Sequence, residues 1–290
     1  MTGEAVGAVE LEGLPLFRRG KVRDTFELDG RLLMVATDRI SAFDCVLPDL
    51  IPGKGRLLTS LTRHWFQQTS DLVPNHLLAD DPRLLPPPLW ERVAGRSMLV
   101  RRAERIDVEC VVRGRLAGSG WEEYQLRGTL AGEPLPPRLT FGAELDPPRF
   151  TPATKSDTGH DQNISRAQLR ELVGAETAGQ LEATSLQLYR AGAAGYLRAG
   201  FVLVDTKFEF GWIDGVLTLI DELLTPDSSR LWEVGSAGTS PGFDKQPVRD
   251  WLLASGWNRQ PPAPRLPPEL ISETSRRYEE VLKRTLSSSS

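Results

Sequence analysis

The stretch Gly200–Gly211, GFVLVDTKFEFG, decides how the fold is read. Its β-branched and aromatic residues predict a strand, and side chains alternate between the two faces of a strand. Asp205, Lys207 and Glu209 therefore share one face, and the other face carries the apolar side chains Val202, Val204, Phe208 and Phe210. Three charges in so apolar a neighbourhood favour a binding site, and a solvated outer face of a sheet is the alternative.

The composition excludes several classes of protein. The chain has 290 residues, 40% of them hydrophobic, so it can bury a substantial core, and its net charge of -4 gives no basic field for nucleic acid. No apolar run reaches the length of a membrane span, and the N-terminus lacks the basic and apolar parts of a signal peptide. Two cysteines and three scattered histidines predict neither a disulfide framework nor a zinc cluster. We expect a cytoplasmic protein.

Lysine is rare in this chain. Among 35 basic residues only six are lysines, namely Lys21, Lys54, Lys155, Lys207, Lys245 and Lys283. A chain so rich in arginine retains lysine where a compact ammonium is needed and a planar guanidinium will not serve. We favour this interpretation for Lys21 and Lys207, because an ammonium suits phosphate binding. Chance and solvated surface positions are the alternative.

The order of predicted elements indicates an α+β fold with two lobes. Asp29-Gly30 predicts the turn of a β-hairpin, and a charged break at 103–107 separates two further strands. Helices are predicted at 55–70, after a cap at Ser165, and at 176–199, 246–254 and 267–285, and the proline-rich stretch 133–152 is expected to be an ordered loop. The predicted lobes are a β-rich part, 1–103, and a larger α+β part, 104–290.

The first hairpin carries a candidate phosphate site. Gly20, Lys21 and Arg23 lie at its start, where backbone amides and two cations can hold a polyphosphate. The alternative is an exposed strand edge guarded by charges. The chain has no P-loop, no GxGxxG and no HExxH motif, so common nucleotide-binding and zinc-hydrolase signatures are missing.

Glu209 and Asp221 are the candidate magnesium ligands. They lie on two strands of one hairpin, and Mg²⁺ prefers one or two carboxylates together with phosphate oxygens. The Asp214-Gly215 turn signal would place them on opposite faces. We therefore predict a three-residue loop, 213–215, that pairs Trp212 with Val216 and brings both carboxylates to one face.

Two further stretches are polar enough to bind anions. Arg113 and Arg115 alternate on a strand that leads into Gly118-Ser119-Gly120, which favours a phosphate or carboxylate pocket as much as a turn with structural glycines. The loop TPATKSDTGHDQNIS brings together Lys155, Asp157, His160 and Asp161.

An ordered set of motifs resembles the SAICAR synthetase family. These are GKVRD, TDRISAFD, VECVVRGRLAGSGW, TKSDTGHDQNIS, LVDTKFEFG, LIDELLTPDSSRLW and DKQPVRDWL, and they cover most of the chain. DRISAFD and IPGKG are similar to the longer, eukaryotic-like branch. The resemblance implies an enzyme that joins aspartate to the carboxylate of carboxyaminoimidazole ribonucleotide with ATP and Mg²⁺, through an acyl phosphate. It also implies a small β-rich lobe on a larger lobe with ATP between them, as in protein kinases.

The resemblance assigns roles to individual residues. ATP would be held at its phosphates by Gly20, Lys21 and Arg23 and at its ribose by Glu109, and the imidazole nucleotide would be held by Arg113, Ser119, Asp227 and Arg230. Lys207 would be catalytic, Glu209 and Asp221 would bind Mg²⁺, and Lys155 and Asp161 would contact ATP phosphates or aspartate. The residues on the aspartate side would be Asp38, Arg39, Ser41 and Asp44.

Two other functions are weighed against this one. A kinase-like phosphotransferase would share the lobes and lysines, but the chain lacks the HRDxxxxN and DFG motifs. A non-enzymatic nucleotide-binding protein has no need for Lys207, Glu209 and Asp221 together. The expected partners are small-molecule substrates without nucleic acid or membrane, and the expected assembly is a monomer or homodimer.

Overall fold

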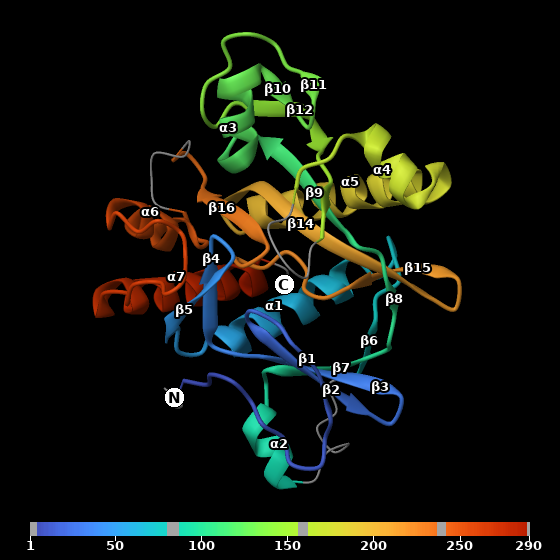
Figure 1. Cartoon of the computed structure of the whole chain (residues 1–290), viewed down its shortest axis with the longest axis vertical. Helices are drawn as coiled ribbons and strands as arrows, with labels where there is room; N and C mark the ends of the chain where they lie inside the picture. Colours follow the sequence, from blue (N-terminus) through green and yellow to red (C-terminus); the bar gives the residue numbers. More distant parts are fainter. Residues whose placement is uncertain (1–4, 80–86, 156–161, 237–241, 289–290) are drawn as a thin grey trace.

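The computed structural model describes residues 5–79, 87–155, 162–236 and 242–288, and its main features are two antiparallel sheets with helices around them (Figure 1). The five-stranded sheet has the order β1 (Leu16–Arg19), β2 (Arg23–Leu28), β3 (Arg31–Ala36), β7 (Ser97–Val100), β6 (Leu77–Ala79). The predicted hairpin is confirmed, because Leu28 pairs with Arg31 across Asp29 and Gly30, whose φ angles are 48° and 74°. Positive φ at both central residues is what this turn requires.

The seven-stranded sheet is built around the opening stretch. β14 (Phe201–Ile213) pairs with β9 (Val108–Arg115), β15 (Val216–Ile220), β16 (Ser229–Glu233) and β8 (Glu104–Arg105), and β9 also pairs with β12 (Glu144–Phe150) and β13 (Ala153–Thr154). The prediction of a loop over the proline-rich stretch is wrong at β12. Phe150 pairs with Val112 there, at the edge of the sheet, where a strand tolerates proline.

Helices cover the apolar face of β14. α4 (Arg166–Val173) and α5 (Ala175–Arg198) lie on this side, and Leu181, Leu188 and Tyr196 pack with Phe201 and Phe208 in the main core. The predicted apolar face is wrong at Val202 and Val204, which pack with Trp232 in a separate cluster, because the register of β14 shifts between Leu203 and Asp205. Ser165 caps α4 as predicted. Its side chain accepts a hydrogen bond from Gln168 N, and the Gln168 side chain accepts one from Ser165 N.

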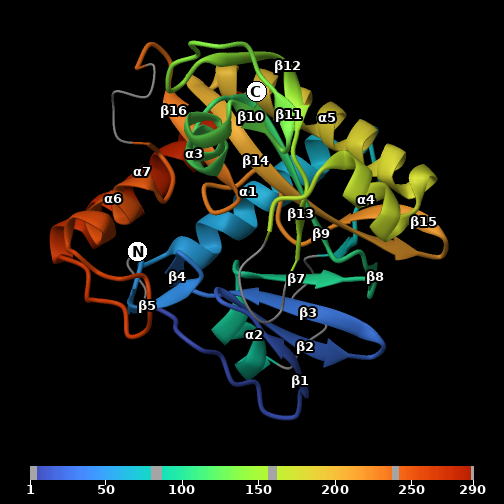
Figure 2. The same cartoon turned by 45° about the horizontal axis from the view of Figure 1, so that its top comes forward.

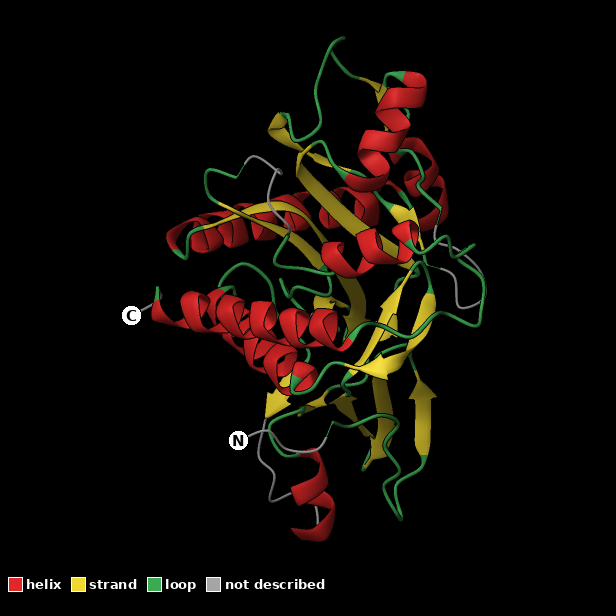
Figure 3. Cartoon of the chain, turned by 90° about the vertical axis from the view of Figure 1, so that its left-hand side faces the viewer, coloured by secondary structure: helices red, strands yellow, loops and turns green. Residues whose placement is uncertain are grey.

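The remaining elements frame the two sheets (Figure 2). They are β4 (Arg39–Ala42), β5 (Cys45–Leu50), α1 (Lys54–Gln68), α2 (Pro87–Val93), α3 (Gly118–Arg127), β10 (Thr129–Leu130), β11 (Glu133–Pro134), α6 (Gln246–Ala254) and α7 (Pro268–Ser287). The predicted closing helices are confirmed, and α6 has the predicted bounds. Figure 3 shows α7 from the side, with its C-terminal end at the edge of the molecule. No helix among the described residues is both long and apolar enough to cross a bilayer.

Helix α1 ties the two sheets together. It precedes residue 103, yet its Leu61 and Trp65 belong to the same core as Tyr196 of α5. Met98 and Val100 of the five-stranded sheet also join that core. A division of the chain at 103 therefore does not separate two independent cores.

The predicted register of the β14–β15 hairpin is wrong. Ile213 pairs with Val216 and Glu209 with Ile220, so the turn is the two-residue Asp214-Gly215 turn that the local sequence signals. A face shared by Glu209 and Asp221 would require β15 to continue through Asp221. Instead β15 ends at Ile220, and Asp221 has a φ of 69°. The alternation of side chains along β15 therefore ends at Ile220 and does not determine the direction of the Asp221 side chain.

Candidate active site

The charged face of β14 forms a floor of paired groups. The Lys207 ammonium lies 2.6 Å from the Glu109 carboxylate of β9, and Glu209 pairs with Lys155 just after β13. Burial lowers the pKa of Lys207, but the Glu109 and Glu209 carboxylates outweigh it and raise that pKa overall. Burial raises the pKa of Glu209, and Lys155 and Lys207 outweigh that effect and hold it at about 2. Glu209 is thus a carboxylate at any physiological pH.

Asp221 faces the same region from the end of β15. It pairs with Arg23 of β2, and Arg23 also lies 3.3 Å from Glu222. Burial raises the pKa of Asp221, and the negative charge of Glu209 raises it further, against the pull of Arg23. The two carboxylates therefore lie close enough to repel each other, although they do not share a regular strand face.

A divalent cation fits this pair. No three His, Cys, Asp or Glu side chains of the described residues gather as a complete metal site. Mg²⁺ does not need one, because it commonly binds one or two carboxylates plus waters and phosphate oxygens. The negative charge of Glu209 raises the pKa of Asp221, and a cation held between the two carboxylates would relieve this repulsion.

Hydrogen bonds stabilise the turn at Gly20, between β1 and β2. Gly20 N donates to Arg23 O at 2.7 Å, and Arg39 donates to Gly20 O at 3.1 Å and to the buried Asp24 at 2.7 Å. A Cβ on Gly20 would lie 3.2 Å from Arg23 O, so the turn is close packed. Lys21 reaches from this turn to Asp44, at 2.5 Å, in the β4–β5 turn. Arg39 is therefore placed to support the turn that carries Lys21.

Asp38 has a structural environment. Its side chain is fully buried and accepts hydrogen bonds from Val6 N, Gly55 N and the Arg96 guanidinium. These bonds fix the N-terminus of α1 and leave the carboxylate enclosed by protein groups. Ser41 is half-buried and pairs with Val46 in β4–β5. Substrate contact by either residue stays a prediction, and the burial of Asp38 does not favour it.

Two arginines share one carboxylate at the other end of the floor. Asp205 is paired with Arg113 at 2.9 Å and with Arg230 at 2.5 Å, and Arg113 also donates to Ser119 at 3.0 Å. A Cβ on Gly118 would lie 2.3 Å from the Arg230 guanidinium and would displace it, and the φ of 53° also favours glycine there. Two guanidiniums against one carboxylate leave a net positive charge, which suits an anionic group of a ligand.

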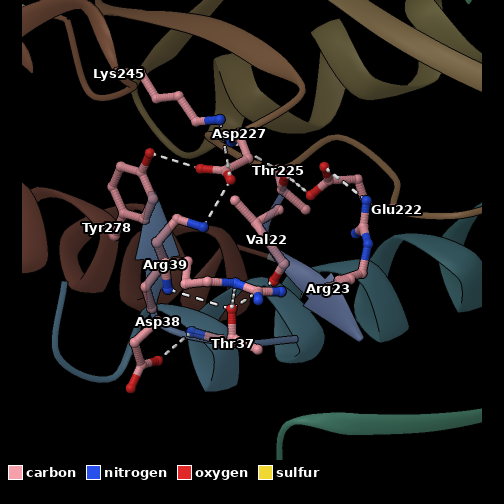
Figure 4. Close-up of polar contacts among 12 residues, drawn as sticks. Val22, Arg23, Thr37, Asp38, Arg39, Glu222, Thr225, Asp227, Lys245 and Tyr278 are labelled. Carbon is pink, nitrogen blue, oxygen red and sulfur yellow. Dashed lines mark hydrogen bonds and ion pairs between the residues drawn. The ribbon is translucent and has the colours of Figure 1, made fainter. Parts of the chain in front are cut away.

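Asp227 anchors a buried cluster of charged and polar side chains (Figure 4). Its side chain, 1% exposed, lies 2.7 Å from the Lys54 ammonium and 3.1 Å from that of Lys245, and it accepts from the Tyr278 hydroxyl at 2.9 Å. Burial raises the pKa of Asp227, but Lys245 and Lys54 outweigh it and lower that pKa well below its usual value. The assigned substrate contact of Asp227 stays a prediction, and the geometry shows a carboxylate occupied by protein cations.

Sequence reasoning gave no role to several members of this cluster. Lys54, Lys245, Tyr278 and Glu222 lie in four different segments, and only the fold brings them to Asp227 and Arg23. The scarcity of lysine was the one available signal for Lys54 and Lys245. Asp161, assigned with Lys155 to ATP phosphates or aspartate, lies outside the described residues.

Taken together, the site has the charges of an enzyme that handles phosphorylated, anionic substrates: a repelling carboxylate pair for a cation at one end and a surplus of guanidiniums at the other. The family model of SAICAR synthetase matches residues 16–264. The phosphoribosylaminoimidazole-succinocarboxamide synthase of Desulfosudis oleivorans is 48% identical over 286 residues, which cover 96% of this chain and 98% of that protein.

Solved structures agree. The SAICAR synthase from Saccharomyces cerevisiae, complexed with SAICAR, has a TM-score of 0.88 and 38% identity, with 98% of each chain covered. A SAICAR synthetase in complex with ADP shares the fold at a TM-score of 0.67 and 24% identity, covering 90% of this chain and 96% of that one. The chain belongs to the SAICAR synthetase family. It is a ligase with phosphoribosylaminoimidazole-succinocarboxamide synthase activity, in purine biosynthesis.

Proposed function

We propose that the chain forms its amide through an acyl phosphate, with ATP and Mg²⁺ bound at the floor of β14. The observation that carries this proposal is a pair of carboxylates in contact with cations: Asp221 pairs with Arg23, and Glu209 with Lys155 and Lys207. A carboxylate is a poor acylating agent, and phosphoryl transfer to it requires charge neutralisation and in-line positioning. These cations, together with a cation bound by the pair, are placed to neutralise charge on the transferring phosphoryl group.

The proposed reaction has two steps. An oxygen of the carboxylate of carboxyaminoimidazole ribonucleotide attacks the γ-phosphorus, and ADP leaves. The aspartate amine then attacks the activated carbonyl carbon, and phosphate leaves with that carboxylate oxygen. Bound Mg²⁺ would supply charge neutralisation on the phosphate oxygens, with Glu209 and Asp221 as its protein ligands.

The roles proposed for the remaining residues follow their positions. Lys21, in the glycine turn, and Arg23 hold the ATP phosphates, and Lys21 exchanges Asp44 for phosphate when the nucleotide enters. Glu109 holds the ATP ribose. Lys207 moves from Glu109 toward the transferring phosphoryl group, which its 34% exposed side chain permits.

The second substrate is placed at the other end of the floor. Arg113, Ser119 and Arg230 hold the ribose phosphate of the imidazole nucleotide, supported by the surplus of positive charge around Asp205. We further propose that the five-stranded sheet acts as a lid lobe over the larger sheet, with ATP between them, in a cytoplasmic monomer or homodimer. The finding that an ADP complex exists on this fold supports the use of ATP.

A phosphate-release assay tests this proposal. Phosphate should appear only when the imidazole nucleotide, ATP, Mg²⁺ and aspartate are all present. Glu209→Gln should raise the Mg²⁺ concentration needed for half-maximal rate at least tenfold, and Glu233→Gln, on the outer strand β16, serves as the control. An unchanged Mg²⁺ requirement in Glu209→Gln would remove Glu209 from the metal site.

A further inference from the structure

Two buried ammoniums face the single carboxylate of Asp227. Lys54 is fully buried, Lys245 is 7% exposed, and both ammoniums approach the same carboxylate oxygen of Asp227. The Lys54 ammonium has no aligned hydrogen bond among the described residues. Two ammoniums that face one carboxylate in a largely buried cluster destabilise each other, and this favours loss of a proton from Lys245, whose side chain is 9% exposed.

The charges around Lys245 come from four segments. Asp227 favours its ammonium form, and so does Glu222, next to the end of β15. Lys54 of α1 and Arg249 of α6 oppose it. Tyr278 of α7 donates its hydroxyl proton to Asp227 and so draws on the same negative charge. Burial is the largest effect, and with Lys54 and Arg249 it lowers the pKa of Lys245 to about 8.

Contacts link the cluster to both ends of the proposed substrate site. On one side, Glu222 accepts from Thr225 at 2.5 Å and pairs with Arg23, which holds Asp221. On the other side, Asp244, the neighbour of Lys245, accepts from Leu231 N at 3.1 Å, directly after Arg230. Figure 4 shows Lys245 reaching Asp227 on one side of the view, with Arg23 and Glu222 on another. Lys245 is thus linked through these contacts to the proposed phosphoryl-transfer end and to the proposed ribose-phosphate end.

The reaction requires a proton acceptor. Free aspartate carries an ammonium at neutral pH, and an ammonium has no lone pair with which to attack a carbonyl. One proton must leave before the carbon–nitrogen bond forms. A base whose pKa is near the operating pH is best suited to take it.

We propose that Lys245 is the catalytic base of amide formation and that Asp227 and Lys54 adjust its basicity. Neutral Lys245 accepts one proton from the aspartate ammonium. The freed amine forms the bond to the activated carbonyl carbon, and the bond from that carbon to the phosphate oxygen breaks. Lys245 then returns its proton to solvent after product leaves. This inference rests on the acyl phosphate route proposed above.

The test compares Lys245→Arg with wild type in single-turnover acyl transfer at saturating aspartate. Arginine keeps the charge and the contact with Asp227 but does not release its proton at working pH. We expect the rate to fall at least a hundredfold while KM for aspartate changes less than threefold. The rate of the wild type should rise with pH up to about 8, and this rise should be lost in the variant. Lys283→Arg, an exposed lysine of α7, is the matched control.

Two results would overturn the proposal. One is a Lys245→Arg rate within threefold of wild type. The other is a change confined to KM for aspartate, which would make Lys245 a binding residue only. A wild-type rate that is flat between about pH 6.5 and 9 would count equally against a base of this kind.

Two additional measurements keep these outcomes distinct. Lys54→Met removes the neighbouring cation, so the rise of the rate should move to higher pH by about one unit, and an unmoved or lowered rise contradicts the proposed tuning. Hydroxylamine is largely neutral at pH 7 and needs no base. Lys245→Arg should therefore still form the hydroxamate from the imidazole nucleotide and ATP. If wild type forms none, the acyl phosphate route fails, and the pH profiles alone then decide the role of Lys245.

Discussion

Arg230→Ala should weaken binding of the imidazole nucleotide far more than binding of ATP. Arg230 is 20% exposed at its side chain and shares Asp205 with Arg113, so its loss leaves Asp205 still paired and the fold intact. A hydrogen bond to a charged group is worth about 1.5–3 kcal/mol, which corresponds to about a 10- to 150-fold rise in KM for the imidazole nucleotide. KM for ATP should stay within threefold, because the proposed ATP cations lie on β2 and before it.

The assay is steady-state phosphate release with each substrate varied in turn. Arg115→Ala is the matched control, since Arg115 lies on the same strand as Arg113 but pairs with the exposed Glu144 at 3.1 Å. Its kinetic constants should remain close to wild type. If KM for ATP rises in Arg230→Ala by the same factor as KM for the imidazole nucleotide, the placement of the ribose phosphate is refuted.

Three further predictions follow from individual contacts. Lys21→Arg and Lys207→Arg should each lower kcat severely although charge is kept, because a guanidinium does not replace a compact ammonium; wild-type kcat in both would reduce the lysine argument to chance. The ion pairs of Glu209 lower its pKa from 4.5 to about 2, so its contribution to stability is present above pH 4.5 and is lost as the pH falls toward 2. The unfolding free energy of Glu209→Gln should therefore fall less than that of the wild type between pH 4.5 and 2. Equal losses in the two proteins would contradict the pairing. Ser165→Ala removes the cap of α4 and should lower stability by about 1 kcal/mol without changing kcat, as thermal melting and the phosphate assay would show together.

Local sequence signals predicted the elements that depend on neighbours in the chain. The Asp29-Gly30 turn and the Ser165 cap were predictable because each depends on the conformation of a few adjacent residues. The β14–β15 turn followed its local signal too, and the error arose from overriding that signal with a metal argument. With the two-residue turn, Asp221 still faces the region of Glu209 because its φ is positive, and no sequence pattern predicts that backbone conformation.

Long-range pairing set the limit for the site. The charged face of β14 was visible from alternation alone, and so was the excess of arginine over lysine. The sharing of Asp205 by two arginines joins β9, β14 and β16, and the Asp227 cluster joins α1, α7 and the segment before α6. Such contacts depend on tertiary packing, so single-sequence reasoning named the residues of the first group and left Lys54, Lys245 and Tyr278 without roles.

The central claim is that the carboxylate of the imidazole nucleotide is activated as an acyl phosphate at the floor of β14. The most direct test labels both oxygens of that carboxylate with ¹⁸O and measures the released phosphate by mass spectrometry. The proposed route predicts one labelled oxygen in every phosphate, because phosphate leaves with a carboxylate oxygen. Unlabelled phosphate, formed while amide accumulates at the normal rate, would contradict it.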